Sequence, residues 1–383
     1  MKLFENKHRT FKELSAHNEN TYDYYDKSAR KNVSIIRKTL NKWFRKYPDE
    51  DKNELKNRFK KEFLSAFYEL FIFNLFKSQG FRIVIHPTIP SNTKRPDFLV
   101  SKNKKEFYIE AKIAKGESKK QESLRKRVNQ IYDSLNTISS PNFFLGIDEL
   151  ELHSTLQPST KTIRDKIETE LKNFDPDDVT RIIQNSGYEY KPKITFEDQS
   201  MTLTISIIPK DPNFRNQEST PIGLYPFEAF WGGEEDSIKS SFNKKAKKYG
   251  TLDKPYLICI NAIGKKFIGD TDVMNAVWGT TALSWSTNPD NRDEKISRIK
   301  DGIFLSDNGP IFKNVSGILI THVMEFNIPI SNYWLMKHPY ANKELDMKKI
   351  YLSYQYVENR RINNIPGKTI GQILKITPNW LDE

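Results

Sequence analysis

The feature that most constrains the fold is a pair of short apolar runs joined by a polar turn within residues 95–113. The first run follows a Pro-Asp step, the turn spans residues 101–105, and the second run continues to residue 113. Two apolar runs on either side of a turn rich in Lys and Asn are typical of a β-hairpin. The sequence therefore predicts two antiparallel strands here.

The second run alternates in polarity, as expected of a strand with two different faces. Its members fall into two sets, Phe107, Ile109, Ala111 and Ile113 on one face and Tyr108, Glu110 and Lys112 on the other. If the turn is centred between Asn103 and Lys104, antiparallel pairing places Asp97 opposite Glu110. Like charges opposite each other on paired strands repel, so the arrangement is unfavourable unless it serves a function.

A hard divalent cation would relieve this repulsion, because Mg²⁺ binds one or two carboxylates together with substrate phosphate and water. A lysine beside it can orient or deprotonate a water molecule, or stabilise charge that develops on phosphorus. An acid followed two residues later by lysine is common in a chain that is 29% charged. Glu110 and Lys112 differ from the other such pairs because they lie inside an apolar strand whose partner opens with Pro-Asp. Together they favour metal-assisted hydrolysis of a phosphodiester.

The motif resembles that of a known enzyme family. Its residues are Pro96-Asp97 and Glu110-Ala111-Lys112, and they resemble the signature of the PD-(D/E)XK nuclease superfamily, which has the restriction-endonuclease-like fold. The resemblance implies an α-β-β-β-α-β core over residues 52–152. It also implies that Asp97, Glu110 and the backbone carbonyl of Ala111 hold Mg²⁺, for which Mn²⁺ can substitute. Lys112 would assist the attacking water, and Glu69 would add a carboxylate from the preceding helix.

The elements read from periodicity follow the same order. They are a helix over 50–78, strands over 81–86, 95–100 and 106–113, a helix over 117–138 and a strand over 142–148. The predicted class is α/β. The predicted domains are an N-terminal helical extension (1–50), a nuclease core (51–154) and a C-terminal α/β domain (155–383), whose role in target recognition, dimerisation or completing one large sheet stays open. Three tyrosines within residues 22–25 are expected to dock on the body rather than bind a partner.

Basic residues flank the motif. They are Lys94, Arg95, Lys115, Lys119 and Lys120, and they would either hold phosphates around the scissile bond or form a solvated basic loop. A second basic cluster occupies residues 244–248 of a predicted helix at 237–249. It would be either a phosphate-tracking face or a solvated helix.

Composition limits the partners. The net charge of +12 favours a polyanion, with nucleic acid ahead of an anionic membrane surface. A single cysteine excludes a disulfide framework and a Cys/His zinc site. No apolar run is long enough to span a bilayer, and no signal peptide is evident, so we expect a soluble cytoplasmic protein that does not enter a membrane.

The sequence favours an Mg²⁺-dependent nuclease acting on DNA, in restriction, defence against phage or mobile elements, or repair. RNA cleavage is a weaker version of the same hypothesis. One alternative is a catalytically silent nucleic-acid-binding protein that retains the fold. Another is a protein-interaction module in which Asp97, Glu110 and Lys112 form a local ion-pair cluster. A homodimer, or a partner protein of a multi-component system, is compatible with each of these.

Overall fold

The computed structural model describes residues 1–90, 93–217, 219–226, 234–264, 269–285, 294–359 and 361–382. Within them the chain is a mixed α/β protein, as the sequence predicts. It divides into two compact units, the first formed by residues 1–13, 20–117 and 231–383 and the second by residues 14–19 and 118–230. These boundaries differ from the expected domains 1–50, 51–154 and 155–383, because segments on both sides of residues 118–230 supply strands to one sheet.

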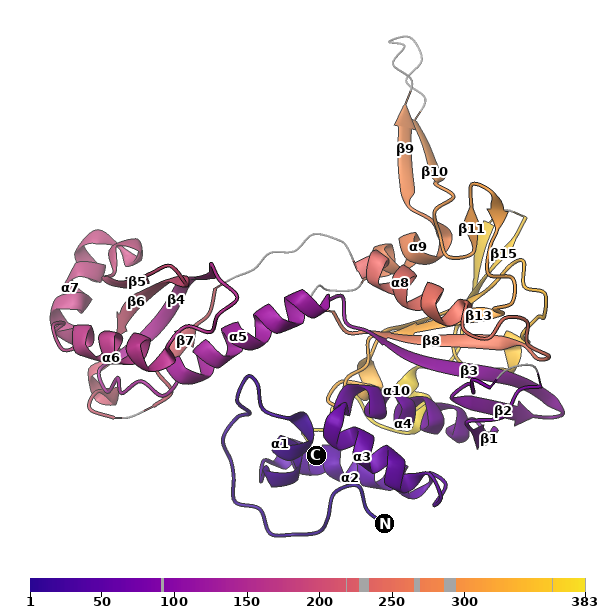
Figure 1. The fold of residues 1–383 in the computed structure, drawn as a ribbon, viewed down its shortest axis with the longest axis horizontal. Helices are drawn as coiled ribbons and strands as arrows, with labels where there is room; N and C mark the ends of the chain where they lie inside the picture. The colour runs from indigo at the N-terminus through magenta and orange to yellow at the C-terminus, as the bar shows by residue number, and fades with distance from the viewer. Residues whose placement is uncertain are drawn as a thin grey trace. The chain divides into compact units, whose positions relative to one another are not determined.

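The first unit is built on an eight-stranded sheet in the order β1-β2-β3-β8-β13-β14-β15-β16 (Figure 1). Its strands are β1 (Arg82–Ile85), β2 (Phe98–Lys102), β3 (Lys105–Ala114), β8 (Tyr256–Ala262), β13 (Gly317–Thr321), β14 (Tyr333–Lys337), β15 (Tyr354–Glu358) and β16 (Arg361–Ile365). Strands β1, β2 and β3 form an antiparallel meander, whereas β3, β8 and β13 are parallel. Strand β14 is antiparallel to β13 and parallel to β15.

The central strands are buried along their whole length and mostly apolar because both faces of the sheet are covered. Every residue of β8 and β13 is buried. Along β8, Leu257 and Cys259 join one apolar cluster, while Tyr256, Ile258 and Ile260 join another. Since successive side chains of a strand point to opposite faces, each face of the sheet carries its own core.

Helices from different parts of the chain supply these cores. The first core takes in α1 (Thr21–Lys27), α2 (Lys31–Arg45), α3 (Lys52–Lys61), α4 (Phe63–Ser78) and α10 (Ile370–Leu374). The second takes in α8 (Glu234–Ala246) and α9 (Asp270–Trp278). In Figure 1, α4 and α10 lie on one side of the sheet and α8 and α9 on the other.

Helix α4 is buried nearly all round, and it carries Glu69 into the core at 3% exposure. The sequence predicts one helix over residues 50–78, but the structure has two, α3 and α4. They are separated at Glu62, whose φ of −139° and ψ of 60° lie outside the helical region. The helix ends before Gly80, as expected, because the φ of +84° at this position suits glycine.

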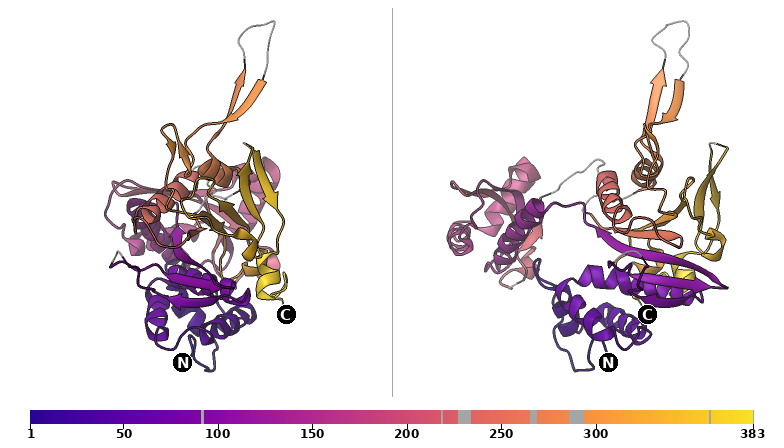
Figure 2. Two further views of the ribbon diagram at one scale, coloured as in Figure 1. Left: turned by 90° about the vertical axis from the view of Figure 1, so that its right-hand side faces the viewer. Right: turned by 45° about the vertical axis from the view of Figure 1, so that its right-hand side comes forward.

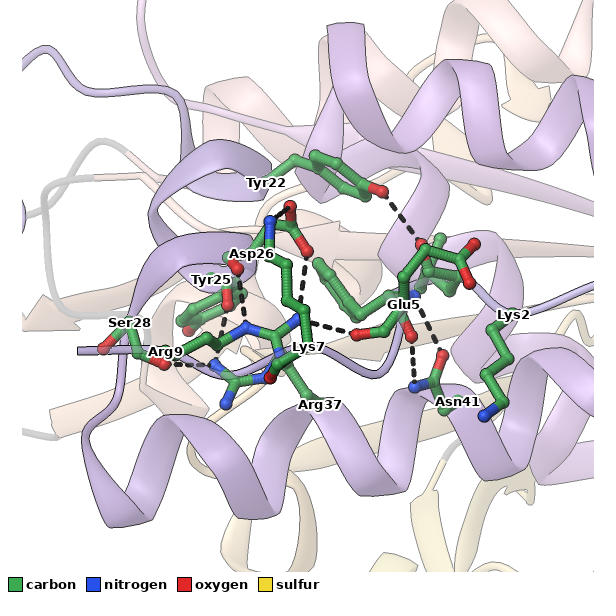
Figure 3. Close-up of polar contacts among 12 residues, drawn as sticks. Lys2, Glu5, Lys7, Arg9, Tyr22, Tyr25, Asp26, Ser28, Arg37 and Asn41 are labelled. Atoms are coloured by element: carbon green, nitrogen blue, oxygen red, sulfur yellow. Dashed lines mark hydrogen bonds and ion pairs between the residues drawn. The ribbon is translucent and has the colours of Figure 1, made fainter. Parts of the chain in front are cut away.

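Side-chain contacts to backbone atoms fix the N-terminal segment on these helices (Figure 3). The Asn41 amide accepts a hydrogen bond from the Phe4 N–H and donates one to the Phe4 carbonyl, both at 2.9 Å. Nη1 of Arg37 donates to the carbonyls of Tyr25 and Ser28, each at 2.7 Å. The three tyrosines within residues 22–25 are only 6 to 8% exposed, which confirms that they dock on the body.

The second unit is a four-stranded sheet with helices packed on it. The strands, in the order β5-β6-β4-β7, are β4 (Phe143–Leu152), β5 (Lys193–Glu197), β6 (Met201–Pro209) and β7 (Ile222–Leu224). The helices are α5 (Lys119–Leu135), α6 (Thr160–Leu171) and α7 (Pro176–Ser186). Apolar residues of these helices and strands form a third core, separate from the two in the first unit.

Strand β4 corrects the expected core. It forms where the sequence predicts a strand at 142–148, but it pairs with β6 and β7 instead of joining the sheet that contains the hairpin. The strand beside β3 is β8. The reason is the pattern of polarity, since β8 is apolar from Tyr256 to Ile260 and suits the centre of a parallel sheet, whereas β4 has exposed residues along one face.

Two smaller pairs of strands complete the first unit. Strands β9 (Thr281–Trp285) and β10 (Glu294–Arg298) form an antiparallel ribbon that projects from the end of α9 (Figure 2). Strands β11 (Leu305–Ser306) and β12 (Gly309–Pro310) form a short hairpin. None of the helices in the described residues has the length and apolar character needed to cross a membrane.

Candidate active site

The predicted hairpin is present as β2 and β3, in the register that the turn predicts. Phe98 pairs with Ile109, and the residue before Phe98 is Asp97, so the same register brings Asp97 opposite Glu110. Asn103 and Lys104 at the turn have φ of 50° and 61°. Two positive φ values in a two-residue loop define the turn that matches the twist of antiparallel strands. The register prediction is confirmed, and the turn is the physical reason for it.

Asp97 is tied directly to the opposite strand. Its Oδ2 accepts a hydrogen bond of 2.7 Å from the backbone N–H of Ala111. Burial, followed by the negative charges of Glu110 and Glu69, raises the pKa of Asp97 from 3.8 to about 7, although the Ala111 hydrogen bond and Lys245 act in the opposite direction. Asp97 keeps part of its surface exposed. This carboxyl group can therefore take up or release a proton near neutral pH.

Glu110 is completely buried and is surrounded by donors from the end of α8. Its Oε1 contacts Nζ of Lys245 and lies 2.8 Å from Nζ of Lys248. Its Oε2 accepts a hydrogen bond from the hydroxyl of Tyr249, which also lies 2.7 Å from the carbonyl oxygen of Arg95. Two ammonium groups thus compensate one carboxylate that has no access to solvent.

Glu69 is also paired with a cation and a phenol, the side chains of Arg58 and Tyr47. The Tyr47 hydroxyl donates to Oε1 of Glu69 at 2.7 Å, and Nη2 of Arg58 lies 2.6 Å from Oε2. Burial lowers the pKa of Arg58, but the charge and hydrogen bond of Glu69, together with Tyr47 and Asp97, outweigh burial and raise it. Glu69 and Arg58 both act electrostatically on Asp97, so the α3–α4 pair and the hairpin share one charged cluster.

Lys112 lies two residues beyond Glu110 on the same face of β3 and is partly exposed. Burial first, then the positive charges of Lys245 and Lys244, lowers the pKa of Lys112. Lys115 adds to this lowering, and Glu62 opposes it. A lysine with a lowered pKa is better able to accept a proton from a water molecule.

The flanking basic residues divide between the two units of the chain. Lys94 and Arg95 are exposed just before Asp97, and Lys115 is exposed just after β3. Lys119 and Lys120 instead begin α5 of the second unit, where Lys120 is exposed, and the Lys119 side chain lies outside the described part of the structure.

Five side chains at this site were not assigned to it from the sequence. They are Tyr47, Arg58, Lys245, Lys248 and Tyr249. The basic cluster at 244–248 was evident, but two of its lysines bind a buried carboxylate, a role different from both a phosphate-tracking face and a solvated helix. For Lys245, Lys248 and Tyr249 a signal lies in the order of elements, because a helix directly before a buried strand repeats the helix–strand unit expected after the hairpin.

The oxygen atoms of Asp97, Glu110 and the Ala111 carbonyl are ligands of the kind that Mg²⁺ prefers. Even so, in the part of the chain that the structure describes, no three or more His, Cys, Asp or Glu side chains are already arranged around a metal position. The positive charge beside Glu110 comes from lysines. The donor set thus fits a hard cation by its chemistry, provided that the lysines yield their places.

Comparison with known proteins gives no indication of the function of this site, which is therefore inferred from its geometry. No family model, no curated protein and no solved structure matches this chain.

Proposed function

We propose that the first unit is a metal-dependent nuclease of the PD-(D/E)XK superfamily that hydrolyses phosphodiester bonds in DNA. One observation carries the proposal: the ammonium group of Lys245 acts on all three motif residues. It contacts Glu110, it opposes the rise in the pKa of Asp97, and it adds to the effect of burial that lowers the pKa of Lys112. Because such electrostatic effects fall off with distance, the two acids and the lysine share one local environment.

The order of elements supports the same proposal. Helix α4 is followed by β1, β2 and β3, and after the second unit the chain continues with α8 and β8. Strand β8 lies parallel to β3, and α8 packs against both strands. This is the order α-β-β-β-α-β, with the second unit inserted between the third strand and the second helix.

Each residue has a role in the proposed reaction. Asp97, Glu110 and the Ala111 carbonyl would hold Mg²⁺ or Mn²⁺, and the bound ion would supply positive charge to the scissile phosphate. Lys112 orients the attacking water and accepts its proton. Arg58 and Tyr47 hold Glu69, which would reach the ion only by exchanging one of these partners.

The partner and the setting belong to the same proposal. The net charge of +12 supports a polyanionic substrate. DNA cleavage in the cytoplasm, for restriction, defence against phage or mobile elements, or repair, is the role that fits such an enzyme, with RNA as a weaker version. A homodimer or a multi-component assembly is compatible with it.

The test is a cleavage assay on supercoiled plasmid, linear duplex, single-stranded DNA and RNA, with Mg²⁺ or with a chelator. Asp97→Ala and Lys112→Ala are each expected to lower the rate at least about 100-fold. Lys105→Ala is the matched control, because Lys105 is exposed at the turn end of the same strand. Cleavage that survives both motif substitutions would remove these residues from the mechanism.

One observation favours a second candidate function. Glu110 already has two lysine partners and a tyrosine donor, so the cluster is compensated without a metal ion. A catalytically silent protein that binds nucleic acid or another protein could use it as a structural ion-pair network. Such a protein would bind nucleic acid with the same affinity with Mg²⁺ as with a chelator, and Lys112→Ala would change its stability without removing an activity.

A further inference from the structure

We propose that Lys245 and Lys248 are exchangeable cations, which a divalent metal ion displaces from Glu110 and which then bind backbone phosphates of the nucleic acid. This inference rests on the proposed nuclease function and gives these lysines a part in it. Neither lysine belongs to the sequence motif, and both follow the inserted second unit in the sequence.

The first step of the argument is the burial of Glu110. Its side chain has no exposed surface, and a buried carboxylate is costly unless it is paired. Both lysines meet the same oxygen, Oε1, with Lys248 at 2.8 Å. The pairing is thus concentrated on one atom of a residue in the proposed metal site.

The second step concerns charge. Asp97 lies opposite Glu110 in the hairpin and bonds to the N–H of Ala111, while Lys245 and Lys248 both contact Oε1 of Glu110. A divalent ion between Asp97 and Glu110 would place two further positive charges next to Lys245 and Lys248. Like charges at such short range repel, so metal and lysines compete for the same carboxylate.

The third step is where the lysines go. Their side chains are 19% and 28% exposed, so each already reaches solvent while bound to Glu110. Lysine has a flexible four-carbon stem, and its ammonium group binds phosphate as a point charge. Lys248 also lies two residues beyond the end of α8.

The experiment measures metal binding and nucleic-acid binding separately on the full chain. Mn²⁺ affinity is measured by calorimetry without nucleic acid for wild type, Lys248→Gln, the double variant Lys245→Gln/Lys248→Gln, and Lys247→Gln. Lys247 is the matched control because it is exposed on the same stretch, with Nζ 5.9 Å from the ring centre of Phe312. Thermal unfolding verifies that each variant is folded, and Lys248→Gln keeps the test usable if the double variant is not.

The double variant is expected to bind Mn²⁺ about tenfold more tightly than wild type, because a charge-assisted contact no longer competes for Glu110. Lys248→Gln should show a smaller change in the same direction, and Lys247→Gln none. For duplex DNA, measured in Ca²⁺, log affinity should fall more steeply with log salt concentration for wild type than for the double variant. The difference in slope should correspond to about two phosphate contacts.

The outcomes separate the two proposals. Equal or weaker Mn²⁺ binding by the double variant than by Lys247→Gln would overturn the exchange, whatever the cleavage assay gives. Tighter Mn²⁺ binding without cleavage of any substrate would support the exchange and count against the nuclease function. Failure of every variant, including wild type, to bind Mn²⁺ would overturn both.

Discussion

Oδ2 of Asp97 lies 2.7 Å from the backbone nitrogen of Ala111, so the acid that precedes β2 is bonded to the strand that carries Glu110 and Lys112. This bond fixes the distance between the arms of the hairpin at the point where the two acids face each other. It uses one oxygen of the carboxyl group. Asp97 is therefore held in place by β3 while part of its surface remains exposed.

Replacing Asp97 with Asn should stabilise the metal-free protein at high pH. The pKa of this acid is raised from 3.8 to about 7, so between these pH values the folded state holds a proton that the unfolded state has lost. The contribution of Asp97 to stability is therefore largest below pH 3.8 and falls as pH rises to 7. At pH 8 in chelator, Asp97→Asn should raise the free energy of unfolding by about 2 kcal/mol, a value reduced for the partial exposure of the side chain.

Urea unfolding at pH 5 and pH 8 measures this effect. Glu106→Gln is the matched control, because Glu106 is an exposed acid on the same strand, paired with Ser101 and 3.9 Å from Lys254. The gain for Asp97→Asn should shrink at pH 5. An equal gain at both pH values would mean that Asp97 titrates normally.

The hairpin was predictable because all its information is local. The turn residues, the alternation and the position of Asp97 lie within residues 95–113, and the observed register follows from them. The partner of β3 was not predictable in this way. The sequence predicts a buried strand over residues 255–261, but parallel pairing needs a crossover, and its length is not fixed by either strand.

The cation partners show the same limit. From the sequence, Lys245 and Lys248 are part of a basic helix. Charged residues near a helix end are normally solvated, so nothing local indicates a buried partner. Their attachment to Glu110 depends on α8 packing against β3, and a whole unit separates these two elements in the sequence. The local sequence pattern therefore predicts Asp97, Glu110 and Lys112, whereas the groups that balance their charge can be identified only once the fold is known.

Arg58 should be essential to stability through Glu69. The two groups lie 2.6 Å apart, and Glu69 has a side-chain exposure of 4%. Arg58→Met leaves a buried carboxylate whose remaining partner among the described residues is the Tyr47 hydroxyl, so the free energy of unfolding should fall by about 3–5 kcal/mol. The double variant Arg58→Met/Glu69→Gln should recover most of that loss, since no charge is then left unpaired. If the double variant is no more stable than Arg58→Met, the loss comes from packing instead of charge.

Lys244 offers a test of Lys112 that leaves the proposed metal ligands intact. The positive charge of the exposed Lys244 lowers the pKa of Lys112, so Lys244→Gln should raise that pKa. If neutral Lys112 accepts the proton of water, activity rises with pH through this pKa, and the rise should move to higher pH in the variant. A pH–rate profile measures the shift, with Lys247→Gln as the control. A profile that does not move would argue that Lys112 acts as a cation.

His338 should make the protein less stable in mild acid. The ring is 1% exposed; Nδ1 accepts a hydrogen bond of 3.0 Å from the Tyr340 N–H, and Nε2 lies 2.8 Å from the Ile311 carbonyl, so the neutral ring with its proton on Nε2 satisfies both partners. Burial lowers its pKa from 6.5 to about 4, with the Ile311 bond opposing and Lys313 assisting. Because the unfolded state binds a proton first, stability is lost as pH falls from 6.5 to 4, by up to about 3 kcal/mol.

Asp97 acts in the opposite direction over much of the same range, so the His338 effect must be measured as a difference between proteins. The free energy of unfolding of wild type minus that of His338→Gln should fall steadily from pH 7 to pH 4, because glutamine cannot take up the proton. NMR titration of the His338 ring gives an independent reading. A ring that titrates near pH 6.5 in the folded protein would contradict the prediction, since burial would then not be resisting its charge.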